Sequence, residues 1–246
     1  MERAVVRQDY RVHFRGFKDS GLLAAELACN IAYFLASAVS KRGGASLVVS
    51  GGSTPVPLFA ALSREDIDWG RVRITLADER WVDSTDSASN EKLVRAHLLQ
   101  NRAAAARFVG LKTGHALARD GEEECAARVG AIPRPFDVLV LGMGEDGHTA
   151  SLFPHAAELA AATDLHSGRL CLALRPATAP HDRMTLTLPA LLASGKIILH
   201  ITGKTKLQVL EQALAAEPLS AGVLNDMPIR HVLALAREAV SVYWAP

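Results

Sequence analysis

The sequence predicts an α/β fold in which helices cover both faces of a mainly parallel sheet. Short runs of β-branched and other apolar residues alternate with longer segments of helical periodicity, which is typical of that fold class. Apolar residues make up 49% and charged residues 22% of the 246 residues, as in an ordinary globular protein. No repeat, low-complexity tract or linker interrupts the pattern, so we expect one domain over residues 1–246.

The first long helix is expected over the apolar segment Leu22–Val39. Asp19 and Ser20 are natural N-caps before it, and Lys41–Gly44 ends it with positive charge and glycine. The segment also carries a glutamate and an asparagine and is rich in alanine. We therefore interpret it as a helix that faces the core and not as a membrane span.

The remaining elements follow from the same alternation. Strands are predicted at Ala45–Val49, Val72–Ala77, Val138–Leu141, Leu170–Leu174, Lys196–Ile201 and His231–Leu235. Helices are predicted from Pro55 to about Leu62 and over Asn90–Leu99, Glu122–Val129 and Lys204–Ala215. Met184–Leu188 alternates as a strand does, and the residues after Leu235 have no clear pattern.

Charge and cysteine content exclude several classes of partner. The net charge is only +1, so no basic field favours nucleic acid or an anionic membrane. Cys29, Cys125 and Cys171 are far apart and include no C-x-x-C, which favours small, buried, reduced thiols over a disulfide scaffold or a zinc cluster. The N-terminus lacks the apolar region of a signal peptide. We expect a cytoplasmic protein and infer no obligate protein partner.

A glycine-rich loop, Gly142–Gly147, follows the apolar strand Val138–Leu141 and is the most informative feature of the chain. It places Asp146 and His148 at the carboxyl end of that strand, where open α/β sheets bind their ligands. Glycines let the backbone turn sharply and let a ligand approach closely. A histidine at such a position can accept and donate protons near neutral pH.

The same loop fits the dinucleotide pattern G-x-G-x-x-G, with Asp164 at the spacing of a ribose-binding acid. Two observations disfavour that interpretation. Glu145 and Asp146 put negative charge where a pyrophosphate would lie, and Pro154 interrupts any helix that begins after the loop. We therefore expect no nicotinamide cofactor.

Metal and serine-nucleophile chemistry are also disfavoured. A metal site would pair His148 with His155 or Asp146, but the chain has no H-E-x-x-H or similar spacing. A serine nucleophile would need G-x-S-x-G, which is absent. We expect no bound metal.

Polar loops after other strands point to the same edge of the sheet. The turn Gly51–Pro55 can present backbone N–H groups at a helix start as a phosphate cradle, with Ser53 or Thr54 as the cap, although an ordinary turn would look the same. Asp78–Trp81 follows a strand with three charges in a row, which a solvated loop would also allow. Lysines in a helix's first turn oppose its dipole; simple exposure explains Lys204, whereas a nearby anion could equally explain Lys206.

The chain resembles the 6-phosphogluconolactonases over about residues 46–215. Five motifs occur in that family's order: SGGSTP at Ser50–Pro55, ADERWV at Ala77–Val82 with Ser89-Asn90 after it, LGMGEDGHTASLFP at Leu141–Pro154, RMT at Arg183–Thr185, and TGKTK at Thr202–Lys206.

The resemblance implies a three-layer, Rossmann-like fold without a cofactor, and hydrolysis of 6-phospho-D-glucono-1,5-lactone in the oxidative pentose phosphate pathway. Within it we predict that His148 activates water, Asp146 orients His148, and Arg80 stabilises the developing oxyanion. Substrate and phosphate would be bound by Gly51, Gly52, Ser53, Thr54, Asp78, Arg183 and Lys206.

Two alternatives stay open. Glucosamine-6-phosphate deaminases share several of these motifs but typically have Glu-Tyr where this chain has Glu79-Arg80, and a further acid where it has Thr149–Pro154. A non-enzymatic sugar-phosphate sensor could keep the same fold. Asp83 and His155 depart from the lactonase pattern, each beside a motif, without touching the predicted chemistry.

Overall fold

An eight-stranded sheet forms the centre of the computed structural model, which describes residues 2–7, 10–177, 179–215 and 220–246. The strand order is β1-β2-β11-β10-β7-β3-β4-β6, and only the β1–β2 pair is antiparallel. The strands are β1 (Glu2–Arg7), β2 (Tyr10–Gly16), β3 (Ala45–Val49), β4 (Val72–Leu76), β6 (Arg107–Val109), β7 (Phe136–Leu141), β10 (Ser194–Thr202) and β11 (Val240–Ala245).

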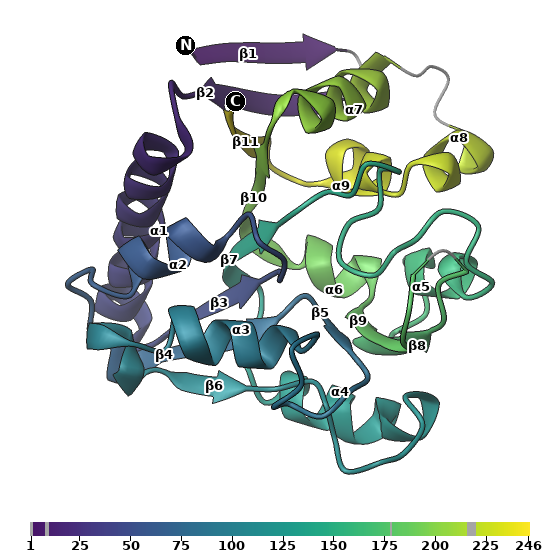
Figure 1. The fold of residues 1–246 in the computed structure, drawn as a ribbon, viewed down its shortest axis with the longest axis horizontal. Coiled ribbons are helices and arrows are strands. Elements are labelled where there is room, and N and C mark those ends of the chain that lie inside the picture. Colours follow the sequence, from purple (N-terminus) through teal and green to yellow (C-terminus); the bar gives the residue numbers. More distant parts are fainter. Residues whose placement is uncertain (1, 8–9, 178, 216–219) are drawn as a thin grey trace.

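Helices cover both faces of this sheet, as predicted. In Figure 1, α1 and α2 lie on one side of it, and α6 and α9 lie on the other. The helices are α1 (Ser20–Arg42), α2 (Val56–Leu62), α3 (Asn90–His97), α4 (Glu122–Gly130), α5 (Leu159–Thr163), α6 (Leu188–Leu192), α7 (Lys204–Ala215), α8 (Ala221–Asp226) and α9 (Ile229–Leu235). The predicted three-layer, mainly parallel α/β fold is confirmed.

Helix α1 has the length and apolar composition of a membrane span, but one of its faces is buried inside the fold. Leu27, Ile31 and Leu35, spaced at one helical turn, are fully buried, and α1 packs on β3, β7 and β11. The Asp19 carboxylate accepts from the Leu22 N–H at 2.8 Å, and Gly43 ends the helix at φ 76°. Both predicted ends are confirmed.

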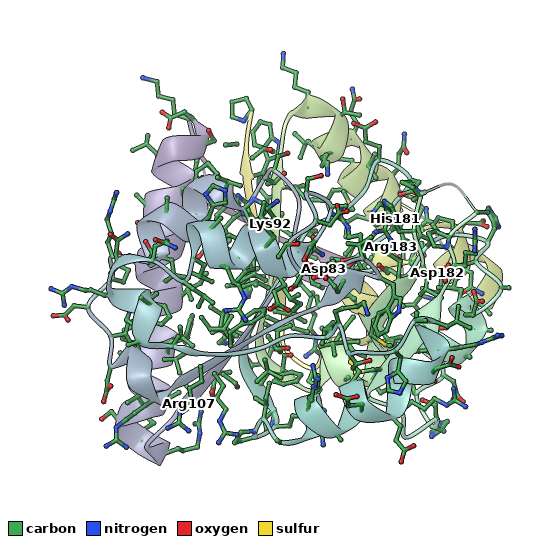
Figure 2. All side chains as sticks on the ribbon, turned by 60° about the horizontal axis from the view of Figure 1, so that its bottom comes forward. Asp83, Lys92, Arg107, His181, Asp182 and Arg183 are labelled. Atoms are coloured by element: carbon green, nitrogen blue, oxygen red, sulfur yellow. The ribbon has the colours of Figure 1, made fainter. Side chains whose placement is uncertain are left out.

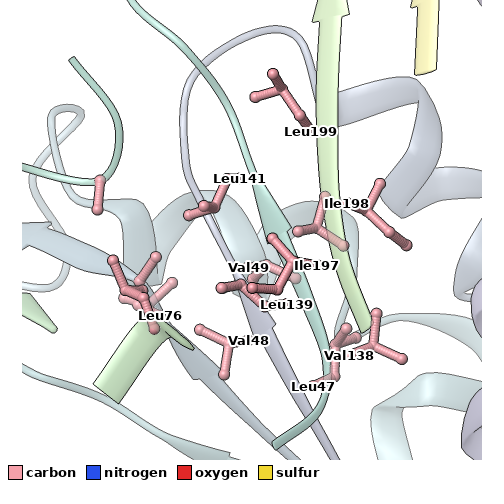
Figure 3. Close-up of a cluster of buried hydrophobic side chains, with 14 of the residues drawn as sticks. Leu47, Val48, Val49, Leu76, Val138, Leu139, Leu141, Ile197, Ile198 and Leu199 are labelled. Carbon is pink, nitrogen blue, oxygen red and sulfur yellow. The ribbon is translucent and has the colours of Figure 1, made fainter. Parts of the chain in front are cut away.

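The core lies where the central parallel strands are buried on both faces. Figure 3 shows β3, β7 and β10 contributing Val48, Leu139 and Ile197 to one apolar cluster. Leu139 pairs in register with Val48 on one side and with Ile197 on the other. Burying each such side chain contributes about 1.5–3 kcal/mol, so these strands fix the positions of the loops that follow them.

A second sheet, not predicted, stands beside the first. Its antiparallel order is β5 (Asp78–Arg80), β9 (Arg183–Leu186) and β8 (Cys171–Leu174). The predicted strand Leu170–Leu174 exists, but it belongs here and not to the parallel sheet. The Leu186 N–H donates to the Ala77 carbonyl at 2.8 Å, which joins the small sheet to the end of β4.

The strand predicted at His231–Leu235 is wrong, because Ile229–Leu235 forms helix α9. Ile229, Val232 and Leu233 are buried at helical spacing, so a short apolar run that suits a strand also suits one face of a helix. The unassigned tail supplies β11, which lies between β2 and β10. The hairpin β1–β2 and the short strand β6 were not predicted.

The cysteine prediction is partly wrong. Cys125 and Cys171 are buried, with their Sγ atoms 3.2 Å apart, whereas Cys29 is exposed on α1. The hydrogen bond with Cys125, together with burial, raises the pKa of the Cys171 thiol well above its usual range. All three are free thiols.

Candidate active site

A pocket of about 240 Å³ lies at the carboxyl ends of β3, β4, β7 and β10. It is called the candidate pocket below. It brings together eight of the residues predicted from the sequence: Gly51, Gly52, Ser53, Thr54, Asp78, Arg80, His148 and Lys206. Asp146 and Arg183 are outside its lining, and each contacts the site through another residue.

His148 and Asp146 form the closest titratable pair of the site. The His148 Nδ1 lies 2.6 Å from the Asp146 Oδ1, and the same oxygen accepts from the His148 N–H at 3.1 Å. Burial alone would raise the pKa of Asp146, but the hydrogen bond and charge of His148 hold it below its usual value. An ionised carboxylate accepts hydrogen bonds only, so Nδ1 carries the proton and Nε2 is the basic nitrogen.

The Gly142–Gly147 loop keeps this pair in place. Gly147 has φ 77°, a left-handed conformation that favours glycine, and its carbonyl accepts from the Ile229 N–H at 2.9 Å. A Cβ on Gly144 would overlap the His148 ring and lie 2.5 Å from the Asp146 carboxylate. Phe153 stacks on the His148 ring at 4.3 Å between centroids. The loop glycines therefore make room for the pair itself.

The loop does not have the geometry of a dinucleotide site. A phosphate-binding helix would begin directly after the last glycine, but Thr149 pairs with Leu152 in an isolated bridge and α5 starts at Leu159. Asp164, the candidate ribose acid, ends α5 and accepts from the His166 N–H at 2.9 Å. Across the described residues no group of three or more His, Cys, Asp or Glu side chains could hold a metal ion.

Glu79 is a buried carboxylate that sequence reasoning did not assign to the site. Its oxygens accept from the N–H groups of Arg80, Asn90 and Glu91 at 2.7–2.8 Å and from the Ser89 hydroxyl at 3.0 Å. Burial raises its pKa, and these hydrogen bonds oppose that rise. Glu79 thus fixes β5 to the start of α3 and positions Arg80 and Asn90.

Arg80 and Arg183 stand opposite each other on β5 and β9. The Arg80 Nη1 donates to the Ala88 carbonyl at 2.6 Å. Arg183 is buried, and its Nε and Nη1 have no hydrogen-bond partner among the described residues. Burial and the charge of Arg80 lower the pKa of Arg183. In Figure 2, Arg183 lies beside Asp182. Two facing guanidinium groups favour an anion between or beside them.

The turn predicted as a phosphate cradle lines the candidate pocket, but the helix after it starts differently from the prediction. Helix α2 begins at Val56 after Pro55, without a side-chain cap, so the capping role predicted for Ser53 or Thr54 is wrong. Gly51 to Thr54 line the candidate pocket, and a Cβ on Gly51 would overlap the Asn90 side chain.

Lys206 approaches the candidate pocket from α7. Its ammonium group donates to the Met143 carbonyl, and burial lowers its pKa although Glu145 and Asp146 oppose that shift. Lys204 is exposed, as predicted. Lys206 therefore provides a partly desolvated cation at the wall of the pocket.

Three further polar residues of the lining were not assigned to the site from the sequence: Ser50, Asn90 and His200. The Ser50 Oγ and the His200 Nδ1 are buried without a partner in the described part of the chain. Burial lowers the pKa of His200 to about 4, so this imidazole is neutral near pH 7. One feature of the sequence could have indicated His200: it is a histidine near the carboxyl end of an apolar strand, just before Ile201-Thr202.

A sequence profile described as "Glucosamine-6-phosphate isomerases/6-phosphogluconolactonase" matches residues 18–244. The chain belongs to this family. A 6-phosphogluconolactonase of Mesorhizobium japonicum is 44% identical, with 95% of each chain covered. That of Pseudomonas aeruginosa is also 44% identical, over 91% of this chain and 90% of the relative.

Solved structures agree with the family assignment. A 6-phosphogluconolactonase from Shewanella baltica superimposes with a TM-score of 0.90 at 51% identity, covering 95% of this chain and 97% of that one. A monomeric glucosamine-6-phosphate deaminase has a TM-score of 0.75 at 18% identity, over 94% and 96% of the two chains, and shares the fold. The description of the family itself names glucosamine-6-phosphate isomerases beside 6-phosphogluconolactonase.

Proposed function

We propose that this protein is a 6-phosphogluconolactonase, which hydrolyses 6-phospho-D-glucono-1,5-lactone to 6-phospho-D-gluconate. The observation that carries the proposal is the 2.6 Å contact between His148 and Asp146 at the wall of a pocket rich in cations and unpaired polar atoms. Relatives of 41–44% identity over most of the chain carry that name.

Hydrolysis of a ring ester needs an activated water and a proton for the leaving oxygen. The His148 Nε2 takes a proton from water as the water oxygen attacks the lactone carbonyl. The tetrahedral intermediate then collapses, the bond between the carbonyl carbon and the ring oxygen breaks, and His148 returns the proton to that oxygen. The Asp146 carboxylate, bonded to Nδ1, holds the ring and stabilises its charged form. General acid–base assistance of this kind contributes about 10²–10⁴-fold.

The cations serve two different parts of the substrate. Arg80 is the candidate for the oxyanion, because Glu79 and the Ala88 carbonyl fix it at the pocket wall. Gly51 to Thr54 and Lys206 would bind the phosphate. Arg183 pairs with Arg80 across β5 and β9, so it would add positive charge next to Arg80 without lining the pocket itself. Fixing the phosphate holds the lactone in the attack geometry, which can supply several kcal/mol of the barrier.

The chemistry of the lining disfavours the deaminase alternative. Asp78 is the one carboxylate that lines the candidate pocket within the described residues, and it accepts from the Ser151 hydroxyl at 2.6 Å. The segment after His148 brings Ser151 and Phe153 to the site, where a deaminase would need a further acid.

The proposed context is a single domain over residues 1–246 that acts in the cytoplasm on a small phosphorylated lactone, without metal, nucleotide cofactor, nucleic acid or obligate protein partner. One continuous buried cluster, free thiols and the burial of α1 inside the fold support this context. Turnover that is lost on chelation and restored by one metal ion would contradict it.

The decisive experiment measures turnover of freshly made 6-phosphogluconolactone above its spontaneous hydrolysis, with glucosamine 6-phosphate as the control substrate. His148→Asn should abolish the enzymatic rate without lowering the melting temperature, because the side chain is on a loop. His166→Asn, an exposed histidine, is the matched control. Deamination of the control substrate, or full activity in His148→Asn, would contradict the proposal. Binding of 6-phosphogluconate without turnover would favour the sensor.

A further inference from the structure

A second cleft lies at the opposite edge of the central sheet. Its lining includes Gly44, Arg71, Arg107 and Phe136, which stand at or just before the first residues of β3, β4, β6 and β7. The candidate pocket is built where three of these strands, β3, β4 and β7, end. Because β3 has five residues, each rising about 3.3 Å, the two sites are roughly 16 Å apart. In Figure 2, Arg107 is well separated from Arg183.

Positive charge is concentrated in this second cleft, which has a volume of about 810 Å³. The whole chain has a net charge of only +1. The lining nevertheless contains five arginines against a single carboxylate: Arg42, Arg71, Arg73, Arg107, Arg134 and Asp137. It is called the basic cleft below, and the proposed lactonase chemistry uses none of these residues.

Three of the arginines have structural partners. Arg42 forms an ion pair with Asp137. Arg71 and Arg73 donate to backbone carbonyls at the carboxyl ends of α1 and α4, where cations are favoured by the helix dipole. Contacts within the fold therefore account for these three side chains.

Arg107 and Arg134 have no such explanation. Both are exposed, and neither side chain makes a hydrogen bond or ion pair with another residue in the described ranges. Arg107 is also the register partner of Arg73 on the neighbouring parallel strand. Like charges side by side on adjacent strands destabilise a sheet, and a bound anion would remove that repulsion.

We propose that the basic cleft binds a polyvalent phosphate anion of nucleotide size. Guanidinium groups bind phosphate oxygens in a bidentate manner, and several of them around one cleft favour more than one phosphate group. Gly44, Gly70 and Gly195 contribute backbone and no side chain to the lining, which leaves more room for such an anion than larger residues would. The inference is independent of the lactonase proposal, because the two sites share no residue.

Calorimetric titration with inorganic tripolyphosphate and with ATP, at low salt and without divalent cations, tests the site. The wild type should bind one anion, and Arg107→Gln/Arg134→Gln should weaken binding at least tenfold. Arg11→Gln/Arg119→Gln removes the same charge from exposed positions elsewhere and should bind as the wild type does. Lactone turnover should be the same in all three proteins.

The candidate pocket could also hold phosphate, so Lys206→Ala is titrated alongside. Binding that survives in Lys206→Ala and is lost in Arg107→Gln/Arg134→Gln supports the basic cleft. Comparable affinity for tripolyphosphate and ATP would identify the phosphate chain as the recognised group, and tighter ATP binding would identify a nucleotide. Absence of binding, or binding that depends on Lys206 and not on Arg107 and Arg134, overturns the proposal. A wild type without lactonase activity would contradict the proposed function alone.

Discussion

His200 gives a prediction whose size follows from its burial. The side chain is 4% exposed, and burial lowers its pKa from an ordinary 6.5 to about 4 in the folded protein. Between pH 6.5 and 4, His200 is therefore protonated in the unfolded chain and neutral in the folded protein. The free energy of unfolding therefore has its full value above pH 6.5 and falls as the pH drops from 6.5 to 4.

The shift of about 2.5 units corresponds to about 3 kcal/mol below pH 4, since one unit equals 1.36 kcal/mol, and to about 2 kcal/mol at pH 5. Against a typical stability of about 5–15 kcal/mol, that loss is large. Urea unfolding of the wild type and of His200→Phe at pH 7.5 and pH 5 measures it. The wild type should lose about 2 kcal/mol more than the variant.

An exposed histidine provides the matched control. His166→Phe should keep the pH dependence of the wild type, because it leaves the buried imidazole in place. His200→Gln serves as a second variant if phenylalanine does not fit beside the pocket. Equal losses of stability in the wild type and in both His200 variants would show that His200 is not held neutral by the fold.

Three further predictions concern the candidate pocket. Gly144→Ala should lower kcat by at least 100-fold, because its Cβ overlaps the His148 ring, whereas Gly114→Ala, with open space around its Cβ, should match the wild type in steady-state kinetics. Equal rates in the two variants would refute the steric argument. Arg80→Ala should lower kcat and not only raise KM, and Arg80→Lys should recover only part of the rate, because lysine lacks the planar fork. An unchanged kcat in Arg80→Ala would show that Arg80 does not stabilise the oxyanion. Lys206→Ala should mainly raise KM for the phosphorylated lactone and leave turnover of unphosphorylated gluconolactone unchanged; a similar rise for both substrates would exclude a phosphate contact.

The sequence specified the fold best where burial made its pattern unambiguous. Strands such as β3 and β7 are apolar on both faces, and a glycine or polar loop follows each, so their positions and ends were predictable. The segment at Ile229–Leu235 was not, because seven residues are too few to separate a strand from one buried helical face. The antiparallel sheet of β5, β9 and β8 depends on pairing between distant segments, which periodicity does not encode.

In the candidate site, too, residues marked by a local sequence pattern were predicted, and residues that depend on tertiary contacts were not. His148 and Lys206 were found because loops after parallel strands meet at one edge of a sheet. Glu79 and His200 were missed because their importance comes from tertiary burial. A glutamate that accepts four hydrogen bonds within the fold has the same sequence signature as one on a solvated loop.

The position of β11 constrains how the protein can be made. The strand β11, Val240–Ala245, separates β2 from β10, so β2 has no parallel neighbour until this strand, more than 200 residues later in the sequence, has left the ribosome. Until then both β2 and β10 expose unpaired edges, which are the surfaces that nascent chains use to aggregate. A chain shortened before Val240 would lose the strand that joins β2 to β10, although every residue of the candidate pocket would still be present.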